Sequence, residues 1–181
     1  MHDAAVAWLA TAIVTVAAVV LFVLAGRSFG LYSVGFAFAV VWLPMMWLGT
    51  ASRAVPPRLP ARLHALRAWE RDGRVYELLG VRGIKALLRR GPFALFNPKL
   101  HLPSEPTPER LAALDRHMRI AEASHAYLFV LTLPWAAWAA MHGAFAAAAA
   151  TVLFDVLVNG YPVMLQRYNR ARLARRFGAL S

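Results

Sequence analysis

Long apolar runs alternate with short polar breaks along this chain, and one long basic segment separates the runs into two pairs. The first pair covers residues 4–25 and 31–50, and the second pair covers residues 121–140 and 144–165. Each run is close to the ~20 residues that an α-helix needs to cross the hydrocarbon core of a bilayer. Because the link inside each pair is short, the pattern predicts an all-α integral membrane fold with four transmembrane helices in two hairpins.

The segment between the pairs, residues 52–119, has a different pattern. Leu59, Leu63 and Leu66 recur at helical spacing among arginines, and a weaker amphipathic pattern follows. We expect these to be interfacial helices that lie in the membrane plane, with their cations toward lipid phosphates. Residues 91–108 hold five prolines and are expected to form a loop. Thr107-Pro108 then predicts the start of a helix, with Thr107 as its cap.

Composition agrees with a membrane protein and excludes several other classes. The chain has 181 residues, of which 60% are hydrophobic and 16% charged, so we expect a single membrane domain. It has no cysteine, which excludes disulfides and thiolate chemistry. The net charge of +11 raises nucleic acid as a partner. The cations avoid the aromatic, apolar runs, however, so membrane lipids or an anionic donor fit better, and no nucleic-acid partner is expected.

The distribution of the 20 Lys and Arg residues predicts the orientation. Fourteen lie between residues 52 and 119, five lie in the basic tail 166–181, and Arg27 is the remaining one. The positive-inside rule places the long segment and the tail in the cytoplasm. With four spans, both termini are then cytoplasmic.

A few polar residues at or within the predicted spans are candidates for chemistry. Glu122 and His125 are three residues apart and share a helix face at the cytoplasmic end of the third span. A carboxylate that holds a histidine tautomer makes that histidine a competent general base. The alternative is a capping Glu and an interface His. Asp155 lies near mid-membrane, one turn from Asn159, and is either a functional residue or a neutral interhelical hydrogen-bond partner.

A metal site is not expected. Di-iron carboxylate bundles use two Glu-x-x-His motifs, and this chain has one, with Asp155 as its other acid within a span. His64, His101 and His117 show no repeated ligand spacing. His101 is flanked by prolines in the loop, where it is either a surface residue or a catalytic one.

The C-terminal stretch carries the most specific signal. The last span contains Asn159 and leads into Gln-Arg-Tyr-Asn-Arg at residues 166–170, followed by Arg172-Leu173. Together with Ala-Glu-x-x-His at 121–125 and the basic segment 70–85, this resembles the glycosyl-4,4'-diaponeurosporenoate acyltransferase family, small bacterial membrane enzymes of carotenoid biosynthesis. The chain is identified as a divergent member, since Ala171 stands where the family usually has proline.

The resemblance implies a multi-pass enzyme of the bacterial inner membrane that moves a fatty acyl group onto a hydroxyl of a glycosylated carotenoid or similar glycolipid at the cytosolic leaflet. His125 would take the hydroxyl proton while Glu122 orients it. The expected substrate-binding residues are His101, Asp155, Asn159, Gln166, Arg167, Tyr168, Asn169, Arg170 and Arg172. No cofactor is implied beyond an acyl donor as co-substrate, either acyl-CoA or acyl carrier protein.

Two other functions remain open from the residues alone. The chain could be a non-catalytic membrane subunit or assembly factor of a pigment or lipid complex, with Asp155 and Asn159 as contacts to a membrane-protein partner. It could also be a metal-dependent lipid-modifying enzyme, which would place at least two further ligands beside His125.

Overall fold

Every described element of this protein is a helix. The computed structural model describes residues 2–89 and 106–178. In chain order the helices are α1 (His2–Phe29), α2 (Val34–Ala51), α3 (Ala61–His64), the 3-10 turn η1 (Ala68–Glu70), α4 (Arg74–Leu78), α5 (Val81–Arg89), α6 (Pro108–Met141), α7 (Phe145–Asp155), the π-helical segment η3 (Val156–Gly160) and α8 (Tyr161–Phe177). The described residues form no strand, as the sequence predicts.

The chain divides into two compact units. The first contains Met1–Arg58 and Ala123–Gly160, and the second contains Leu59–Glu122 and Tyr161–Ser181. Helix α6 contributes its N-terminal part to the second unit and its C-terminal part to the first. The single membrane domain expected from the sequence stays a prediction.

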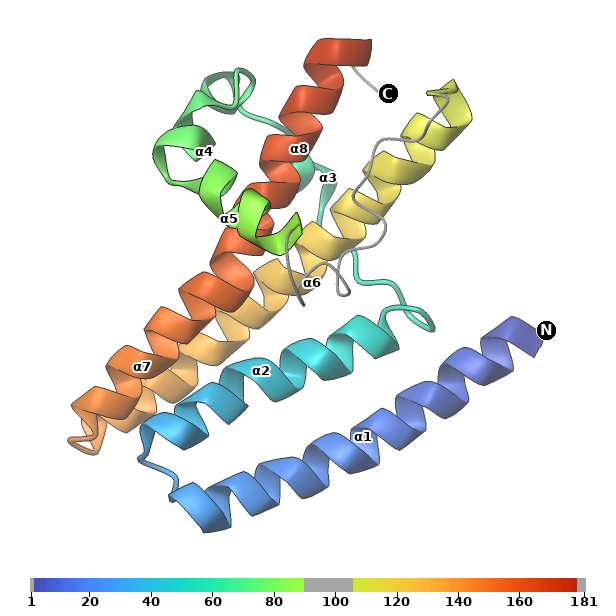
Figure 1. Ribbon diagram of the computed structural model, residues 1–181. Coiled ribbons are helices and arrows are strands. Elements are labelled where there is room, and N and C mark those ends of the chain that lie inside the picture. Colours follow the sequence, from blue (N-terminus) through green and yellow to red (C-terminus); the bar gives the residue numbers. More distant parts are fainter. Residues whose placement is uncertain (1, 90–105, 179–181) are drawn as a thin grey trace. The chain divides into compact units, whose positions relative to one another are not determined.

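In the first unit, α1 and α2 run side by side from the turn at residues 30–33 (Figure 1). Gly30 ends α1 with a φ of 77°, and the Ser33 side chain caps α2 by accepting a hydrogen bond from the Phe36 N–H at 3.0 Å. Further along, Trp47 Nε1 donates to Thr15 Oγ1 at 2.8 Å. The close packing of the pair therefore follows from a capped turn and an interhelical hydrogen bond.

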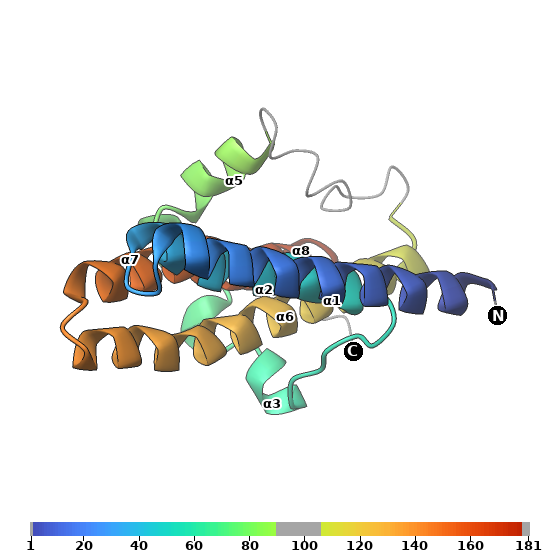
Figure 2. The same ribbon diagram turned by 90° about the horizontal axis from the view of Figure 1, so that it is seen from below.

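The first unit also holds the C-terminal part of α6, α7 and the π-helical segment. The short link expected between residues 140 and 144 is a turn, with Gly143 at a φ of 75°. In Figure 2, α6 and α7 run alongside each other into this turn. Helix α7 is rich in alanine, and Ala147 and Ala148 are buried. Small side chains of this kind allow close helix contact in lipid.

Three helical stretches among the described residues are long and apolar enough to cross a membrane: Asp3–Phe29, Val34–Ala51 and Phe145–Phe177. They correspond to the first, second and fourth predicted spans. The third, at residues 121–140, lies in α6, which is not one of these stretches. Its apolar half includes His125, Tyr127 and Pro134, which lower its hydropathy. The structure thus confirms an all-helical fold with three candidate spans and does not confirm the count of four.

The second unit packs the short helices and the N-terminal part of α6 against α8. Tyr76 and Val81 are buried with Leu165 and Tyr168 of α8. A separate cluster joins Leu111 and Met118 of α6 to Leu173 of α8. Helix α6 begins at Pro108, as predicted, and the Arg110 N–H donates to Thr107 Oγ1 at 3.4 Å. The described residues of the predicted interfacial region therefore form four short helical elements and the start of a long one.

Candidate active site

The helix that continues from α7 changes its winding at the polar residues expected to be functional. Residues Val156–Gly160 form a π-helical turn, and π turns inside helices are often found at functional sites. Asp155 and Asn159 are both fully buried, and Asn159 Nδ2 donates to Asp155 Oδ1 at 2.7 Å. The π turn thus carries an amide whose orientation a buried carboxyl group fixes.

His125 of α6 completes this group, which we call the His125 triad: His125, Asn159 and Asp155. His125 Nδ1 lies 3.0 Å from Asn159 Oδ1. The amide nitrogen of Asn159 donates to Asp155, so the amide oxygen of Asn159 faces the His125 ring as an acceptor. His125 Nδ1 therefore carries the proton. A neutral His125 then holds its lone pair on Nε2, which is the form that a general base needs.

Gly160 allows the π-helical turn to approach α6 as closely as the His125 triad requires. A Cβ added at Gly160 would lie 3.3 Å from the ring of Phe129 on α6. That separation is tighter than an ordinary van der Waals contact. Glycine at the end of the π turn therefore lets its backbone come close to α6, where His125 lies.

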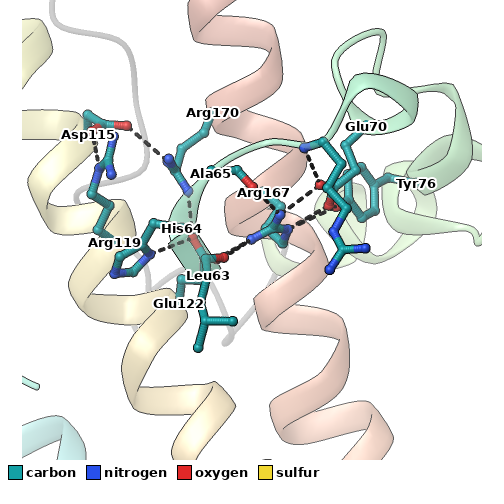
Figure 3. A network of polar contacts seen from close by, with 11 residues as sticks. Leu63, His64, Ala65, Glu70, Tyr76, Asp115, Arg119, Glu122, Arg167 and Arg170 are labelled. Carbon is teal, nitrogen blue, oxygen red and sulfur yellow. Dashed lines mark hydrogen bonds and ion pairs between the residues drawn. The ribbon is translucent and has the colours of Figure 1, made fainter. Parts of the chain in front are cut away.

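Glu122, expected to orient His125, has other partners in the second unit. Its Oε1 accepts from Arg167 Nη1 at 2.6 Å, and its Oε2 accepts from Arg170 Nη1 at 2.7 Å. His64 Nδ1 lies 3.3 Å from the same Oε2 (Figure 3). The residue that orients the His125 ring in the structure is Asn159, which the sequence placed among the substrate-binding residues.

Arg167 has an acceptor for each of its five N–H groups. Its Nε and Nη2 bind the two carboxylate oxygens of Glu70, each at 2.7 Å. Its Nη1 donates to Glu122 and to the Leu63 carbonyl, and Nη2 also donates to the Ala65 carbonyl at 3.0 Å. Figure 3 shows the guanidinium enclosed by these groups. No N–H of Arg167 is left for a substrate.

Arg170 extends the same network through Asp115. Arg170 Nε donates to Asp115 Oδ1 at 3.0 Å, and Arg119 Nε donates to the other oxygen at 2.5 Å. We call the whole group the arginine–carboxylate cluster; its members are Glu70, Asp115, Glu122, Arg119, Arg167 and Arg170. Three carboxylates meet three guanidinium groups, so their charges balance. Buried charges persist in proteins when they are paired and hydrogen-bonded in this way.

The pKa of Glu70 shows how strongly the cluster favours the charged carboxylate. Burial alone would raise this pKa. Hydrogen bonds from Arg167, from the Tyr76 hydroxyl and from the backbone N–H of Arg67 outweigh burial and lower the pKa of Glu70 to about 2. Glu70 therefore remains ionised in the folded protein down to strongly acidic pH.

The other predicted residues of the C-terminal motif lie in different surroundings. Tyr168 is buried, and its hydroxyl donates to Glu77 at 2.7 Å. Asn169 Oδ1 accepts from Lys85 Nζ at 2.7 Å. Gln166 is buried, and its Oε1 has no hydrogen-bond partner among the described residues. Arg172 is exposed. The substrate-binding roles expected for these residues stay predictions.

An apolar cleft of about 310 Å³ lies between α1 and α2 in the first unit. Leu21 and Leu24 of α1 and Phe38, Trp42 and Leu43 of α2 form much of its lining. A cleft of this character suits a hydrocarbon chain and offers almost no polar group to a ligand.

Two further expectations from the sequence concern His101 and a metal site. His101 lies outside the described residues. Among residues 2–89 and 106–178, no group of three or more His, Asp or Glu side chains has a geometry that could hold a metal ion.

Sequence reasoning missed Glu70, Tyr76 and Asp115 as partners of the C-terminal arginines. A usable signal was the scarcity of acids, since the chain has nine Asp and Glu against 20 Lys and Arg. An acid that lies within a basic segment of a membrane protein is a natural partner for a buried arginine. The residues themselves do not say which arginine each acid meets.

The family model described as glycosyl-4,4'-diaponeurosporenoate acyltransferase matches residues 60–178. This range contains the His125 triad and the arginine–carboxylate cluster, and it excludes α1 and α2. No curated protein and no solved structure matches the chain.

Proposed function

This chain belongs to the glycosyl-4,4'-diaponeurosporenoate acyltransferase family, and we propose that it transfers a fatty acyl group to a hydroxyl of a glycosylated carotenoid or similar glycolipid at the cytosolic leaflet. Membership places it among acyltransferases of carotenoid biosynthesis. The observation that carries the finer proposal is the hydrogen-bonded His125 triad, because it supplies an oriented base within the region that the family model matches.

In the proposed reaction, His125 Nε2 accepts the proton of the acceptor hydroxyl while the hydroxyl oxygen attacks the carbonyl carbon of the acyl donor. The tetrahedral intermediate then collapses, the bond from the acyl carbon to the donor breaks, and the protonated His125 returns the proton to the leaving group. Asn159 holds the imidazole with its Nδ1 proton inward throughout, and Asp155 holds the Asn159 amide. The product is the acylated glycoside and the deacylated donor.

We assign the predicted role of Glu122 differently. Both of its oxygens are occupied by arginines, so it stabilises the arrangement of α6 and α8 within the second unit. The apolar cleft between α1 and α2 is a candidate place for an acyl or polyene tail.

We also propose the membrane topology expected from the cations: four spans in the bacterial inner membrane with both termini in the cytoplasm. Fourteen cations in the long segment and five in the tail support it. A reporter fused after Ser181 is expected to be inaccessible from outside the cell. An externally accessible reporter would show that the C-terminus lies outside the cell and would contradict a site on the cytosolic side.

The alternative of a non-catalytic subunit has less support from the described residues. In that function Asp155 and Asn159 would contact a partner, whereas the structure joins them to each other and to His125.

The test compares His125→Ala with His117→Ala. His117 is an exposed histidine on the same helix, whose Nδ1 lies 2.7 Å from the Ala113 carbonyl. Cells that make the glycosylated pigment would express each variant, and the lipid extract would be analysed by mass for a species heavier by one acyl chain. We expect His117→Ala to retain transfer and His125→Ala to lose about 100- to 10,000-fold of the rate. Normal transfer by His125→Ala would rule out the proposed base.

A second variant isolates the orienting contact. Asn159→Leu removes the acceptor for the Nδ1 proton and leaves His125 in place. We expect kcat to fall while the KM for the acceptor changes little, since the loss concerns the ring tautomer.

A further inference from the structure

Two leucines at the turn between α4 and α5 project from the surface of the second unit. Leu78 is 87% exposed, the largest fraction of any large hydrophobic side chain among the described residues, and Leu79 is 48% exposed. A single exposed leucine is common on protein surfaces. Turns, however, are usually occupied by Gly, Pro, Asn, Asp or Ser. Two adjacent leucines at such a position therefore favour an apolar partner at this surface.

The exposure of the two leucines follows from the packing on either side of them. Tyr76 and Val81 are both buried, and they pack with Leu165 and Tyr168 of α8, which lies beside α4 and α5 in Figure 1. Between these two anchors the chain turns at Gly80, which has a φ of 78°. Because the chain is fixed before and after the turn, the leucines between the anchors point away from α8.

The backbone of this turn is hydrogen-bonded within the protein. The Leu79 N–H donates to the Val75 carbonyl at 3.1 Å, and the Leu79 carbonyl accepts from the Tyr161 hydroxyl at 3.0 Å. The Gly80 N–H donates to the Glu77 carbonyl at 3.1 Å, and the Gly80 carbonyl accepts from the backbone N–H three residues further on at 3.0 Å. Lipid excludes backbone polar groups that lack a partner. The backbone groups of Leu79 and Gly80 meet this requirement.

The contact with Tyr161 places the turn beside the apolar end of α8. Tyr161 belongs to the stretch Phe145–Phe177, which is long and apolar enough to cross a membrane. Residues 161–165 carry no charge, and the first cation that follows is Arg167, about 9 Å further along the helix at 1.5 Å per residue. Tyrosine is enriched at membrane–water interfaces. The turn therefore lies where this helix passes from an apolar to a charged sequence.

The charged residues around the leucines balance each other. Asp72 pairs with Arg74 at 3.8 Å, and Glu77 pairs with Arg82 at 3.7 Å, so the charges of residues 72–82 sum to zero. These four side chains are between 36% and 85% exposed, and exposed ion pairs contribute little energy. Long side chains of this kind can keep their charges in water while apolar neighbours enter lipid. The apolar surface of the leucines, rather than a net positive charge, thus determines the partner.

We propose that Leu78 and Leu79, which we call the leucine tip, insert into the lipid surface of the leaflet from which α8 emerges. Amphipathic elements enter about 5–10 Å into the boundary between headgroups and acyl chains. The leucine tip docks the second unit, with its arginine–carboxylate cluster, on the membrane. This lipid contact is separate from the proposed acyl transfer and does not depend on it.

The test uses a fluorescent label at a single position. The chain has no cysteine, so one introduced cysteine is the only thiol that reacts with the dye. Full-length Leu78→Cys, labelled with an environment-sensitive dye, would be placed in nanodiscs of zwitterionic lipid. Arg116→Cys is the matched control, because Arg116 is also exposed and lies in the same unit, on the polar part of α6. Both substitutions replace exposed side chains and leave the packing unchanged.

We expect the label at position 78 to emit at shorter wavelength and to be quenched by lipids brominated on their acyl chains. The label at position 116 is expected to be quenched by iodide in the water. A second variant pair carries the label through Leu79→Cys, with and without Leu78→Glu. Because a carboxylate is costly in the hydrocarbon boundary, Leu78→Glu is expected to move this label toward water.

Four results would each overturn the inference. The first is equal exposure to water of the labels at positions 78 and 116. The second is an apolar environment at position 78 that brominated lipid does not quench, because a second copy or another protein surface would then cover the leucine tip. The third is insertion that occurs only with anionic lipid, and the fourth is an unchanged label at position 79 in Leu78→Glu. Acyl transfer is not measured, so failure of the leucine tip leaves the proposed function standing.

Discussion

Arg167→Ala is expected to destabilise the fold of this protein rather than weaken the binding of its substrate. The substitution removes all six hydrogen bonds in which the guanidinium takes part. Glu70 loses both contacts from Arg167, and Glu122 loses one of its two arginines. The side chains of Glu70 and Glu122 are only 3% and 2% exposed. Water cannot replace the lost partner without opening the second unit.

The magnitude follows from the burial of these carboxylates. Removal of one partner from a buried ion pair typically costs about 3–5 kcal/mol, because a buried charge is left uncompensated. For a chain of this size, each kcal/mol lowers the unfolding temperature by about 2–4 °C. We therefore expect Arg167→Ala to unfold about 6–20 °C below the wild type.

The assay is thermal unfolding of the purified protein in detergent, followed by tryptophan fluorescence and by the fraction that remains monodisperse after heating. Arg116→Ala serves as the control, since substitutions of exposed side chains usually change stability by about 0.5 kcal/mol or less. Arg167→Lys is expected to recover only part of the loss. Lysine keeps the charge but cannot bind Glu70 through two parallel N–H groups.

One result would refute this reasoning. If Arg167→Ala unfolds at the wild-type temperature and raises the KM for the acyl donor, Arg167 binds the substrate, as its place in the motif predicts. A fold held by the arginine–carboxylate cluster cannot lose Arg167 without a measurable change in unfolding.

Three further outcomes are expected. Gly73→Ala should lower the unfolding temperature by several degrees, because the φ of 74° costs a residue with a Cβ about 1–2 kcal/mol and that Cβ would also approach the Tyr168 ring; an unchanged temperature would contradict the packing. The contribution of Glu70 should be complete above its ordinary pKa of 4.5 and be lost as pH falls toward about 2; Glu70→Gln should therefore be less stable at pH 7 and less sensitive to acid, as denaturant titrations at several pH values would show. Extensive dialysis against EDTA should leave acyl transfer unchanged; loss of transfer that Zn²⁺ or Fe²⁺ restores would show a metal requirement.

The helical elements could be predicted from the sequence where a strong local signal exists. The apolar runs at 4–25 and 31–50 correspond to α1 and α2, and Thr107-Pro108 marks the start of α6. These features depend on residues adjacent in the chain, so periodicity and capping chemistry are sufficient. The third span is different, because its polar and aromatic residues lower the hydropathy of α6.

The partners of the polar residues could not be predicted in the same way. Glu122 and His125 share a helix face, which made a contact between them the natural hypothesis. In the structure, Glu122 instead binds arginines 45 and 48 residues away, and His125 binds an amide 34 residues away. Spacing along one helix sets which side chains are neighbours, while packing against another helix decides which of them meet a stronger partner.

The family motif consequently contains two kinds of polar residue that the sequence alone cannot separate. Arg167 has no N–H left for a ligand, so a substitution of Arg167 tests the stability of the fold. His125 uses one ring nitrogen to bind Asn159 and keeps the other for a proton, so its exchange tests the chemistry. A variant of Arg167 that retains its structure and a variant of His125 that retains transfer would each reverse one assignment without affecting the other. The two can be tested independently, although both lie within the one region that the family model matches.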